Sequence, residues 1–471
     1  MPAVLLKEFR LKRNIVLEEF EGPVIGEKKA PVPLPEETMQ ERKDRILQKM
    51  KEENLDTLLV YEDLEHGSNF EYLTGFLTRF EEALLVLHKD GKAFLLLGNE
   101  NMKMVSHSRI KAEGIHVPFF SLPNQPMEDE KKFTEYLQEA GLQSGSHVGI
   151  IGWKMFTGCK TDPGTMFEIP YYIVEAVREI TAEITNRSDL FIGGSRGIRT
   201  VNNAEEIAHY EYGAALAGSC MHHAVDQIEE GRTEMEIAGC LCADGQPHSV
   251  ITIAATGKRF EKANLYPTDK KIRLQDCVSL TTGYKGGLSS RAGYAVRKKE
   301  ELPGQTYDYI EKLAAPYFGA VVEWLESIKT GMTGGELYQK IEEVLPKETY
   351  HWSLNPGHMT ADEEWMSSPI YKDSEEILKS GMILQIDIIP SLQGYGGCGC
   401  ESTVALADQK LQEEIREKNP ELFLRFMKRR EYMEKVLHIR LSEEILLMSD
   451  TVAYYRPFFL NKKLAFRVRE E

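Results

Sequence analysis

The sequence predicts an α/β amino-terminal domain followed by an α+β carboxy-terminal domain. A chain of 471 residues is too long for one ordinary hydrophobic core, so more than one domain is expected. In the first part, short apolar runs alternate with helical patterns, which is typical of a sheet covered by helices. In the second part, a long helical pattern precedes strand-like segments that alternate with further helices. This order favours helices on one face of a largely antiparallel sheet.

Changes in composition predict three segments. Residues 1–36 are mixed in polarity and rich in proline, so they are expected to form an extended amino-terminal arm. The amino-terminal domain is expected over 37–192 and the carboxy-terminal domain over 193–471. The boundary is placed at the glycine-containing stretch FIGGSRGIRT, because the first long helix of the second part begins directly after it.

The expected elements of the amino-terminal domain are two helices and a set of buried strands. A helix is predicted over about 37–53, where Ile46 and Met50 fall on one face, and a second helix near 100–112. Four apolar runs bounded by turn residues are predicted to be strands: DTLLVYE (56–62), EALLVLH (82–88), KAFLLLG (92–98) and SHVGIIG (146–152).

The carboxy-terminal domain shows helix-start signals and a helix breaker. Asn203 with Glu206, and Thr333 with Glu336, have the spacing of capping boxes. Pro316 interrupts a helical pattern over 305–329, so a kink or break is expected there. Strands are expected at four places, and a helical tail follows them: 249–254, 277–282, 381–389 and 401–406, then 420–437.

Charge and cysteine content exclude several classes of partner. The net charge of −17 opposes binding to nucleic acid and to anionic membranes. No apolar run approaches the roughly 18 residues of a membrane span. The seven cysteines are scattered and odd in number, which favours reduced thiols and a cytoplasmic location.

His358 ends the stretch HWSLNPGH, and its chemical role is open from the residues alone. An Asn-Pro-Gly turn can fix the side chain that follows it at a strand end. Such a histidine can be a metal ligand, a proton-transfer group, or a buried residue without chemical duty. The sequence around His358 does not choose among these three roles.

Asp387 and Glu401 are the acids that stand out. Asp387 interrupts the apolar run GMILQIDIIP, where a buried carboxylate is costly unless it is paired, protonated or bound to a cation. An aspartate that bonds backbone amides at the strand end, before Pro390, is the alternative reading. Glu401 begins the strand-like ESTVALA, and Cys400 points to the opposite face, so a cysteine–glutamate metal pair is not expected.

Several motifs in this order resemble the pita-bread family of methionine aminopeptidase, aminopeptidase P, prolidase and creatinase. The motifs are LDTLLVYEDLEHGSNFEYLTGF, GIRTVNNAEEIAHYEYGAALAG, NPGH, LKSGMILQIDIIP and CESTVAL. The resemblance covers about 37–465. It implies a creatinase/prolidase-like amino-terminal domain, a pita-bread carboxy-terminal domain, a homodimer, and a small-molecule or short-peptide substrate.

The resemblance also implies a set of site residues and a departure from the family pattern. Family peptidases hold two divalent metals with two Asp, one His and two Glu. His358 matches the histidine, Glu401 matches one glutamate, and Asp387 stands in place of the other. Uncharged side chains fall on the remaining family positions: Thr281 and Ser290 on the two aspartates, and Asn264 and Trp365 on two accessory histidines.

Arg79 falls on a family loop that reaches towards the partner subunit's site, and it is a candidate contact for a substrate carboxylate. A surface arginine without a role is the alternative. Together with Asn264, Thr281, Ser290 and Trp365, it completes the candidate substrate-binding residues.

Three functions follow from this pattern. The first is a hydrolase without metal or other cofactor, in which His358 is the general base and Asp387 and Glu401 orient it. The second is a catalytically silent protein that binds a ligand or partner. The third is an Xaa-Pro peptidase with one Mn, Fe or Zn ion held by the same three residues.

Overall fold

The computed structural model describes residues 14–26, 30–78, 80–128 and 130–469, which form two compact units. The amino-terminal unit is Leu34–Thr200, and the carboxy-terminal unit combines the arm up to Pro33 with Val201–Glu471. The arm groups with the second unit because its strand β1 (Ile15–Glu19) pairs antiparallel with the last strand, β16 (Leu464–Val468). Among the described residues, no helix is both long enough and apolar enough to cross a membrane.

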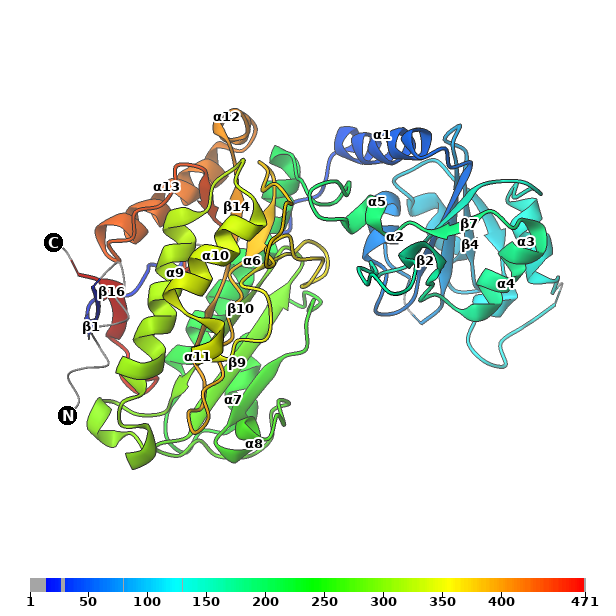
Figure 1. Ribbon diagram of the computed structural model, residues 1–471. Coiled ribbons are helices and arrows are strands. Elements are labelled where there is room, and N and C mark those ends of the chain that lie inside the picture. The colour runs from blue at the N-terminus through cyan, green and yellow to red at the C-terminus, as the bar shows by residue number, and fades with distance from the viewer. Residues whose placement is uncertain (1–13, 27–29, 79, 129, 470–471) are drawn as a thin grey trace. The chain divides into compact units, whose positions relative to one another are not determined.

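The amino-terminal unit is a six-stranded mixed sheet with helices, as expected for an α/β domain (Figure 1). Its strands lie in the order β5 (Glu113–His116), β4 (Ala93–Leu97), β3 (Ala83–His88), β2 (Thr57–Glu62), β6 (Val148–Ile151) and β7 (Ile184–Asn186). Its α-helices are α1 (Glu36–Glu52), α2 (Ser68–Thr74), α3 (Phe133–Glu139), α4 (Tyr171–Ile180) and α5 (Asp189–Ile192). The four predicted strand segments contain β2, β3, β4 and β6.

The predicted helix near 100–112 is wrong in type and length. That segment contains only the 3₁₀ helix Met102–His107, followed by irregular chain. Its start is held by the buried Glu81, which accepts hydrogen bonds from the backbone amides of Glu100 and Asn101. The segment therefore owes its conformation to this tertiary contact, which its own residue pattern does not reveal.

The carboxy-terminal unit contains two four-stranded antiparallel sheets. The first has the order β13 (Gly399–Glu401), β10 (Gly287–Tyr294), β9 (Cys277–Tyr284) and β8 (Ile253–Thr256). The second has the order β11 (His358–Met359), β12 (Ile383–Gln385), β14 (Thr403–Leu406) and β15 (Ile445–Leu447). Because β13 and β14 follow each other in the chain, one extended segment passes from the first sheet to the second.

The helices of this unit begin where the sequence signals predict. The long helix α6 (Ala204–Asp226) starts at the Asn203–Glu206 capping box, and α10 (Gly334–Val344) starts at the Thr333–Glu336 box. The expected break at Pro316 is a π-helical turn, Ile310–Ala314, followed by α9 (Ala315–Ser327) with the proline in its first turn. The other helices are α7 (Glu234–Ala238), α8 (Lys258–Glu261), α11 (Lys347–Tyr350), α12 (Gln409–Lys418) and α13 (Pro420–Lys435).

Helix α6 lies against β9 and β10, and glycine allows the close approach. A Cβ atom at Gly213 would lie 1.9 Å from the carbonyl oxygen of Lys285, in the turn between the two strands. This contact seats the helix on one face of the first sheet. The predicted α+β architecture of the second domain is therefore confirmed. Its strands carry four of the candidate site residues: Thr281, Ser290, His358 and Glu401.

Candidate functional site

A tight turn places His358 at the start of β11. The carbonyl of Pro356 accepts a hydrogen bond from the Trp324 indole at 2.8 Å. Gly357 follows with φ of 140°, and a Cβ there would lie 2.9 Å from the carbonyl oxygen of Gln385. Glycine is thus required where the chain meets β12. His358 itself is 1% exposed and pairs with Gln385 across the strands.

Asp387 and Glu401 reach the same place through the register of neighbouring strands. Gln385 pairs with Thr403, and the Ile386 amide donates to the Ser402 carbonyl at 2.9 Å. Continuing this register sets Asp387 opposite Glu401, because each lies two residues beyond the pair Gln385–Thr403. Side chains two residues apart share a face. Both acids therefore point to the side of the sheet that carries the Gln385 side chain.

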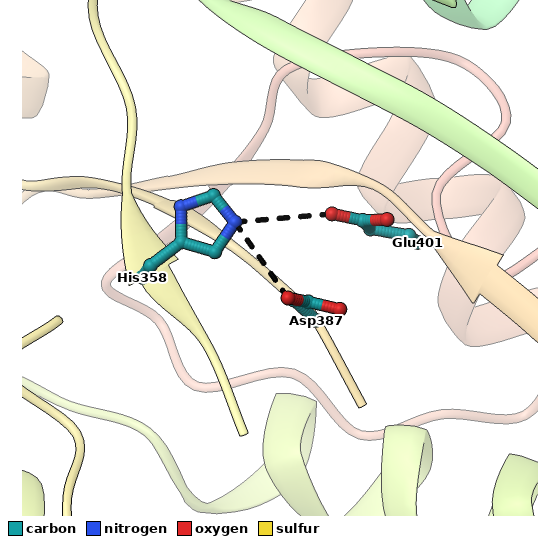
Figure 2. A group of neighbouring side chains, drawn as sticks. All are labelled: His358, Asp387 and Glu401. Atoms are coloured by element: carbon teal, nitrogen blue, oxygen red, sulfur yellow. Dashed lines mark ion pairs between the residues drawn. The ribbon is translucent and has the colours of Figure 1, made fainter. Parts of the chain in front are cut away.

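The three side chains converge, as Figure 2 shows. His358 Nε2 lies 3.9 Å from Asp387 Oδ2 and 3.9 Å from Glu401 Oε1. The Nδ1 atom of His358 lies 3.1 Å from the Met359 carbonyl oxygen. Since a carbonyl only accepts, Nδ1 must carry the proton in this contact, and in the neutral ring Nε2 faces the acids with its lone pair.

Glu364 joins this group, and the sequence did not single it out. Its Oε1 lies 3.5 Å from His358 Nε2, and its side chain is 23% exposed. Met359 and Ser367 form an antiparallel bridge, so the intervening loop returns to β11 and brings Glu364 back to the histidine. The only signal in the sequence was an acidic run beside Trp365. We call His358, Asp387, Glu401 and Glu364 the acid–histidine cluster.

Burial dominates the electrostatics of the cluster. Burial raises the pKa of Asp387 to about 8, and the neighbouring Glu401 charge adds to this. Burial likewise raises the pKa of Glu401 to about 8, with repulsion from Glu364. The pKa of Glu364 is also raised by burial, while the nearby His358 opposes the shift. Ionised carboxylates are therefore unfavourable here unless a positive charge lies between them.

The cluster fits one cation. Among the described residues, His358 Nε2 and Asp387 Oδ1 are buried polar atoms without a hydrogen-bond partner. One ligand atom from each of His358, Asp387 and Glu401 lies within 4.8 Å of the others. Atoms 3.9 Å apart are too far for a hydrogen bond, yet each can lie about 2.0–2.2 Å from a shared ion. Their nitrogen and oxygen donors suit Mn, Fe or Zn.

Glu401, Ser290 and Thr281 lie on three neighbouring strands of the first sheet, and their side chains form one row across it. Ser290 pairs with Glu401 on one side and with Thr281 on the other. The two hydroxyl oxygens lie 2.9 Å apart, and Ser290 Oγ also donates to the Leu280 carbonyl at 3.2 Å. We call Thr281 and Ser290 the hydroxyl pair. They carry no charge and bond to each other, so they do not fit a second divalent ion.

Two of the three remaining candidates lie in the described part of the chain, and the structure places Trp365 beside the cluster. The Trp365 ring lies 5.4 Å from the His358 ring between centroids, and the tryptophan is 50% exposed, so it borders the cluster. Asn264 is exposed in a loop, and its backbone amide and carbonyl both bond to Arg259. Arg79 lies outside the described residues.

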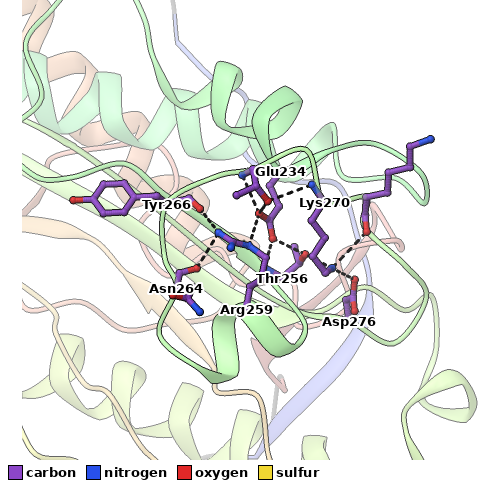
Figure 3. A network of polar contacts seen from close by, with 9 residues as sticks. Glu234, Thr256, Arg259, Asn264, Tyr266, Lys270 and Asp276 are labelled. Atoms are coloured by element: carbon purple, nitrogen blue, oxygen red, sulfur yellow. Dashed lines mark hydrogen bonds and ion pairs between the residues drawn. The ribbon is translucent and has the colours of Figure 1, made fainter.

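The Asn264 loop is fastened by a buried acid, as Figure 3 shows. Glu234 is 1% exposed and accepts hydrogen bonds from the backbone and hydroxyl of Thr256, the backbone and hydroxyl of Thr268, and the Arg259 guanidinium. Arg259 in turn donates to the Tyr266 carbonyl. The loop also bonds to β8, where the Ala254 amide donates to the Leu265 carbonyl. The loop is thus held beside Ile253, which pairs with Thr281.

Comparison with known proteins finds two family matches in the expected order. A sequence model of the creatinase/prolidase N-terminal domain matches residues 42–154, and one of metallopeptidase family M24 matches residues 208–408. An Xaa-Pro dipeptidase of Pyrococcus furiosus is 25% identical over 227 residues, which are 45% of this chain and 62% of that protein. One of Pyrococcus horikoshii is 22% identical over 299 residues, 60% of this chain and 76% of that protein. The first match thus spans less than two thirds of the relative's length.

Solved structures share the fold. The prolidase from Pyrococcus furiosus superimposes with a TM-score of 0.58 and 20% identity, covering 77% of this chain and 96% of that chain. An Xaa-Pro dipeptidase from Bacillus anthracis gives 0.59 and 18%, covering 79% and 96%. The motif order, both family matches and the two-domain fold agree. The chain therefore belongs to the creatinase/prolidase pita-bread family.

Proposed function

We propose that this protein is a hydrolase that cleaves a C–N bond in a small peptide-like substrate at the acid–histidine cluster, with one divalent cation bound there. The observation that carries the proposal is the position of His358 Nε2. It is buried, lacks a hydrogen-bond partner among the described residues, and faces three carboxylates at 3.5–3.9 Å. Folding such a group costs free energy, and a function accounts for keeping it. Relatives named Xaa-Pro dipeptidase support the substrate class.

His358, Asp387 and Glu401 would hold the cation, and Glu364 lies at the more exposed side. A bound Mn, Fe or Zn ion would supply a polarised carbonyl and an activated water at neutral pH. The Nδ1 contact with the Met359 carbonyl fixes the ring so that Nε2 is the donor atom to the ion. Burial raises the pKa of Glu364, so it holds a proton more readily than an ordinary glutamate, and its place at the edge of the cluster suits it to exchange that proton with the substrate.

A cofactor-free hydrolase is the second candidate, and the orientation of His358 favours it as well. Because Nδ1 is engaged by a backbone carbonyl, Nε2 is the free base of the ring. A water placed between Nε2 and the acids could give its proton to His358, while Asp387 and Glu401 stabilise the imidazolium that forms. The 3.5–3.9 Å separations leave room for either a water or an ion.

One experiment separates these candidates. Purified protein is assayed on a panel of dipeptides and small amides before and after chelator treatment, and its metal content is measured. The proposal predicts turnover that the chelator removes and one added equivalent of Mn, Fe or Zn restores. Turnover that resists the chelator would instead support the cofactor-free hydrolase. No turnover under any condition would overturn both and leave a silent ligand-binding protein.

The matched variants are His358→Asn and His351→Asn. The second histidine lies seven residues earlier, is exposed, and has a φ of 51°, which asparagine tolerates. We expect His358→Asn to lose at least about 1,000-fold in kcat/KM, because it removes a ligand or the base. His351→Asn should keep activity within a factor of two or so. Equal activity of the two variants would contradict a role for His358.

A further inference from the structure

A small cavity of about 20 Å³ lies between α6, β10 and the chain at 451–459. Two arginines, Arg291 and Arg456, and the histidine His222 are among the residues that line it. Both arginines are 4% exposed. Arg291 follows Ser290 along β10 and therefore points to the opposite face of the first sheet. A cavity of this size holds one water molecule or one ion of similar size, and it is too small for phosphate or sulfate.

The side chains around this cavity carry more positive than negative charge. Asp226 is the carboxylate that pairs with them: its oxygens lie 2.7 Å from Arg456 Nη2 and 3.3 Å from His222 Nδ1. Arg291 forms no ion pair with any acid in the described part of the chain, and it donates to carbonyl and hydroxyl oxygens. Such bonds satisfy its N–H groups but do not cancel its charge. One of the two guanidinium charges is therefore buried without a counter-ion, which is costly.

The pKa values of two neighbouring bases agree with this excess of positive charge. Burial lowers the pKa of His222, and the charges of Arg456 and Arg291 add to the shift while Asp226 opposes it. Burial also lowers the pKa of Lys462 to about 8, and the Arg456 charge adds to that shift. Lys462 donates to two carbonyls at the carboxy-terminal end of α6, so its ammonium group balances the negative end of the helix. The charge of Asp226 is thus left to balance both arginines.

Arg456 also has an N–H group that no protein atom uses. Its Nη1 donates to the Lys462 carbonyl at 2.9 Å. Its Nη2 is buried and has no hydrogen-bond partner among the residues that the structure describes. The contact with Asp226 is short enough for a hydrogen bond, so it is the direction of the N–H bonds that fails. A buried guanidinium donor beside a cavity suits an anion, because hydrogen bonds between charged groups are the strong ones.

We infer that this cavity binds one chloride ion or another halide of similar size. The ion accepts a hydrogen bond from Arg456 Nη2 and balances the charge that Arg291 brings into the interior. The net charge of −17 repels anions from the protein as a whole, so binding here depends on the local arginines. Arg291 donates to the backbone carbonyl of Glu401 at 2.7 Å. The ion therefore stabilises a guanidinium that holds the strand of a candidate site residue.

Chloride-35 NMR tests this inference on the full chain. The protein is kept in sodium gluconate, and chloride replaces gluconate at constant ionic strength, both before and after chelator treatment. We expect saturable line broadening that survives the chelator, which removes any chloride bound to a metal ion. Bromide should reverse the broadening, and sulfate should not, because it exceeds the cavity. The absence of saturable broadening, its loss after chelation, or equal displacement by sulfate would overturn the inference.

Two substitutions with opposite expected effects locate the ion. Arg456→Gln removes the charge and the free donor, so chloride binding should weaken at least about 10-fold. Arg297→Gln removes a half-exposed guanidinium of the same unit and should leave binding unchanged. Asp226→Asn removes the carboxylate that competes with the ion, so binding should strengthen about 5-fold, whereas Asp373→Asn, at an exposed turn, should not change it. Unchanged binding in Arg456→Gln or in Asp226→Asn would overturn the assignment.

A measurement without substitutions covers the case in which Arg456→Gln does not fold. Crystals of the unmodified protein are soaked in sodium bromide, and anomalous scattering is recorded at the bromine edge. We expect a bromine peak in the cavity, in contact with Arg456 Nη2. A cavity that holds only water under these conditions would overturn the inference. The result does not depend on whether a cation binds at the acid–histidine cluster.

Discussion

The acid–histidine cluster and the hydroxyl pair lie on one row of side chains but differ in how their polar groups are satisfied. At the hydroxyl pair, each hydroxyl proton has an acceptor within the protein. At the cluster, His358 Nε2 and Asp387 Oδ1 have none among the residues the structure describes. An unsatisfied buried polar atom costs about 1–3 kcal/mol. This difference supports the proposal that one cation binds along this row, at the cluster and not at the hydroxyl pair.

The largest effect is expected from a substitution that removes one of the three proposed cation ligands. Asp387→Asn exchanges a carboxylate for a neutral amide of the same shape, so we expect affinity for Mn or Zn to fall at least about 100-fold. Competition against a chromogenic chelator measures this affinity. The same exchange at an exposed turn, Asp373→Asn, is a suitable control and should keep wild-type affinity. Unchanged affinity in Asp387→Asn would place the ion elsewhere.

The next prediction concerns a variant in which the hydroxyl pair is replaced by two carboxylates. The double variant Thr281→Asp/Ser290→Asp restores two carboxylates next to Glu401, where the strands already pair in register. We expect the metal content to rise from one to two equivalents, because carboxylates can neutralise a second ion. Metal analysis of the reconstituted protein measures this. A variant that folds but still holds one equivalent would show that the row cannot support a second site.

A smaller effect is expected at the exposed edge of the cluster. Glu364→Gln keeps the shape but removes the group suited to proton transfer, so kcat should fall about 100-fold with little change in cation affinity. The limb of the pH–rate profile that belongs to Glu364 should also disappear. If cation affinity fell as far as in Asp387→Asn, Glu364 would be a fourth ligand and not the proton-transfer group.

The smallest effect concerns the stability of the protein without metal. The pKa values of Asp387 and Glu401 are raised to about 8 in the folded chain, against about 4 when unfolded. The folded chain therefore binds protons at these two carboxyl groups more tightly than the unfolded chain does. Their contribution is fully present below about pH 4 and is lost as the pH rises towards and through 8.

Chelator-treated protein should thus be less stable at pH 8.5 than at pH 5.5, and Asp387→Asn/Glu401→Gln should reduce that difference by roughly 1–3 kcal/mol. Urea denaturation at the two pH values measures it. Added Mn or Zn should protect the unmodified protein at pH 8.5 but not the double variant. Equal pH dependence in both proteins would show that these acids are not buried in the way described.

Much of the fold could be predicted from sequence because its signals are local. The Asn203–Glu206 box marks the start of α6, and Pro316 marks the start of α9, since capping and the missing proline N–H act within one turn. The 3₁₀ segment at 102–107 could not be predicted, because the carboxylate of Glu81 that holds it lies 20 residues away in the chain from Asn101.

The candidate site was predictable only in part, because some of its contacts depend on how distant parts of the chain meet. His358, Asp387 and Glu401 were found through motifs and through the cost of an acid in an apolar strand. Glu364 was missed because the loop that returns it to His358 is set by the Met359–Ser367 bridge, which no residue pattern announces. The mutual hydrogen bond of Thr281 and Ser290 likewise depends on the β9–β10 register, which only the folded chain defines.

The most direct test of a single cation at the acid–histidine cluster is the metal stoichiometry of the reconstituted protein. Protein stripped with a chelator is dialysed against excess Mn or Zn, freed of unbound ion, and analysed for metal per chain. We predict one equivalent in the unmodified protein and in His351→Asn, and none in His358→Asn. Two equivalents in the unmodified protein, or one that persists in His358→Asn, would contradict the account.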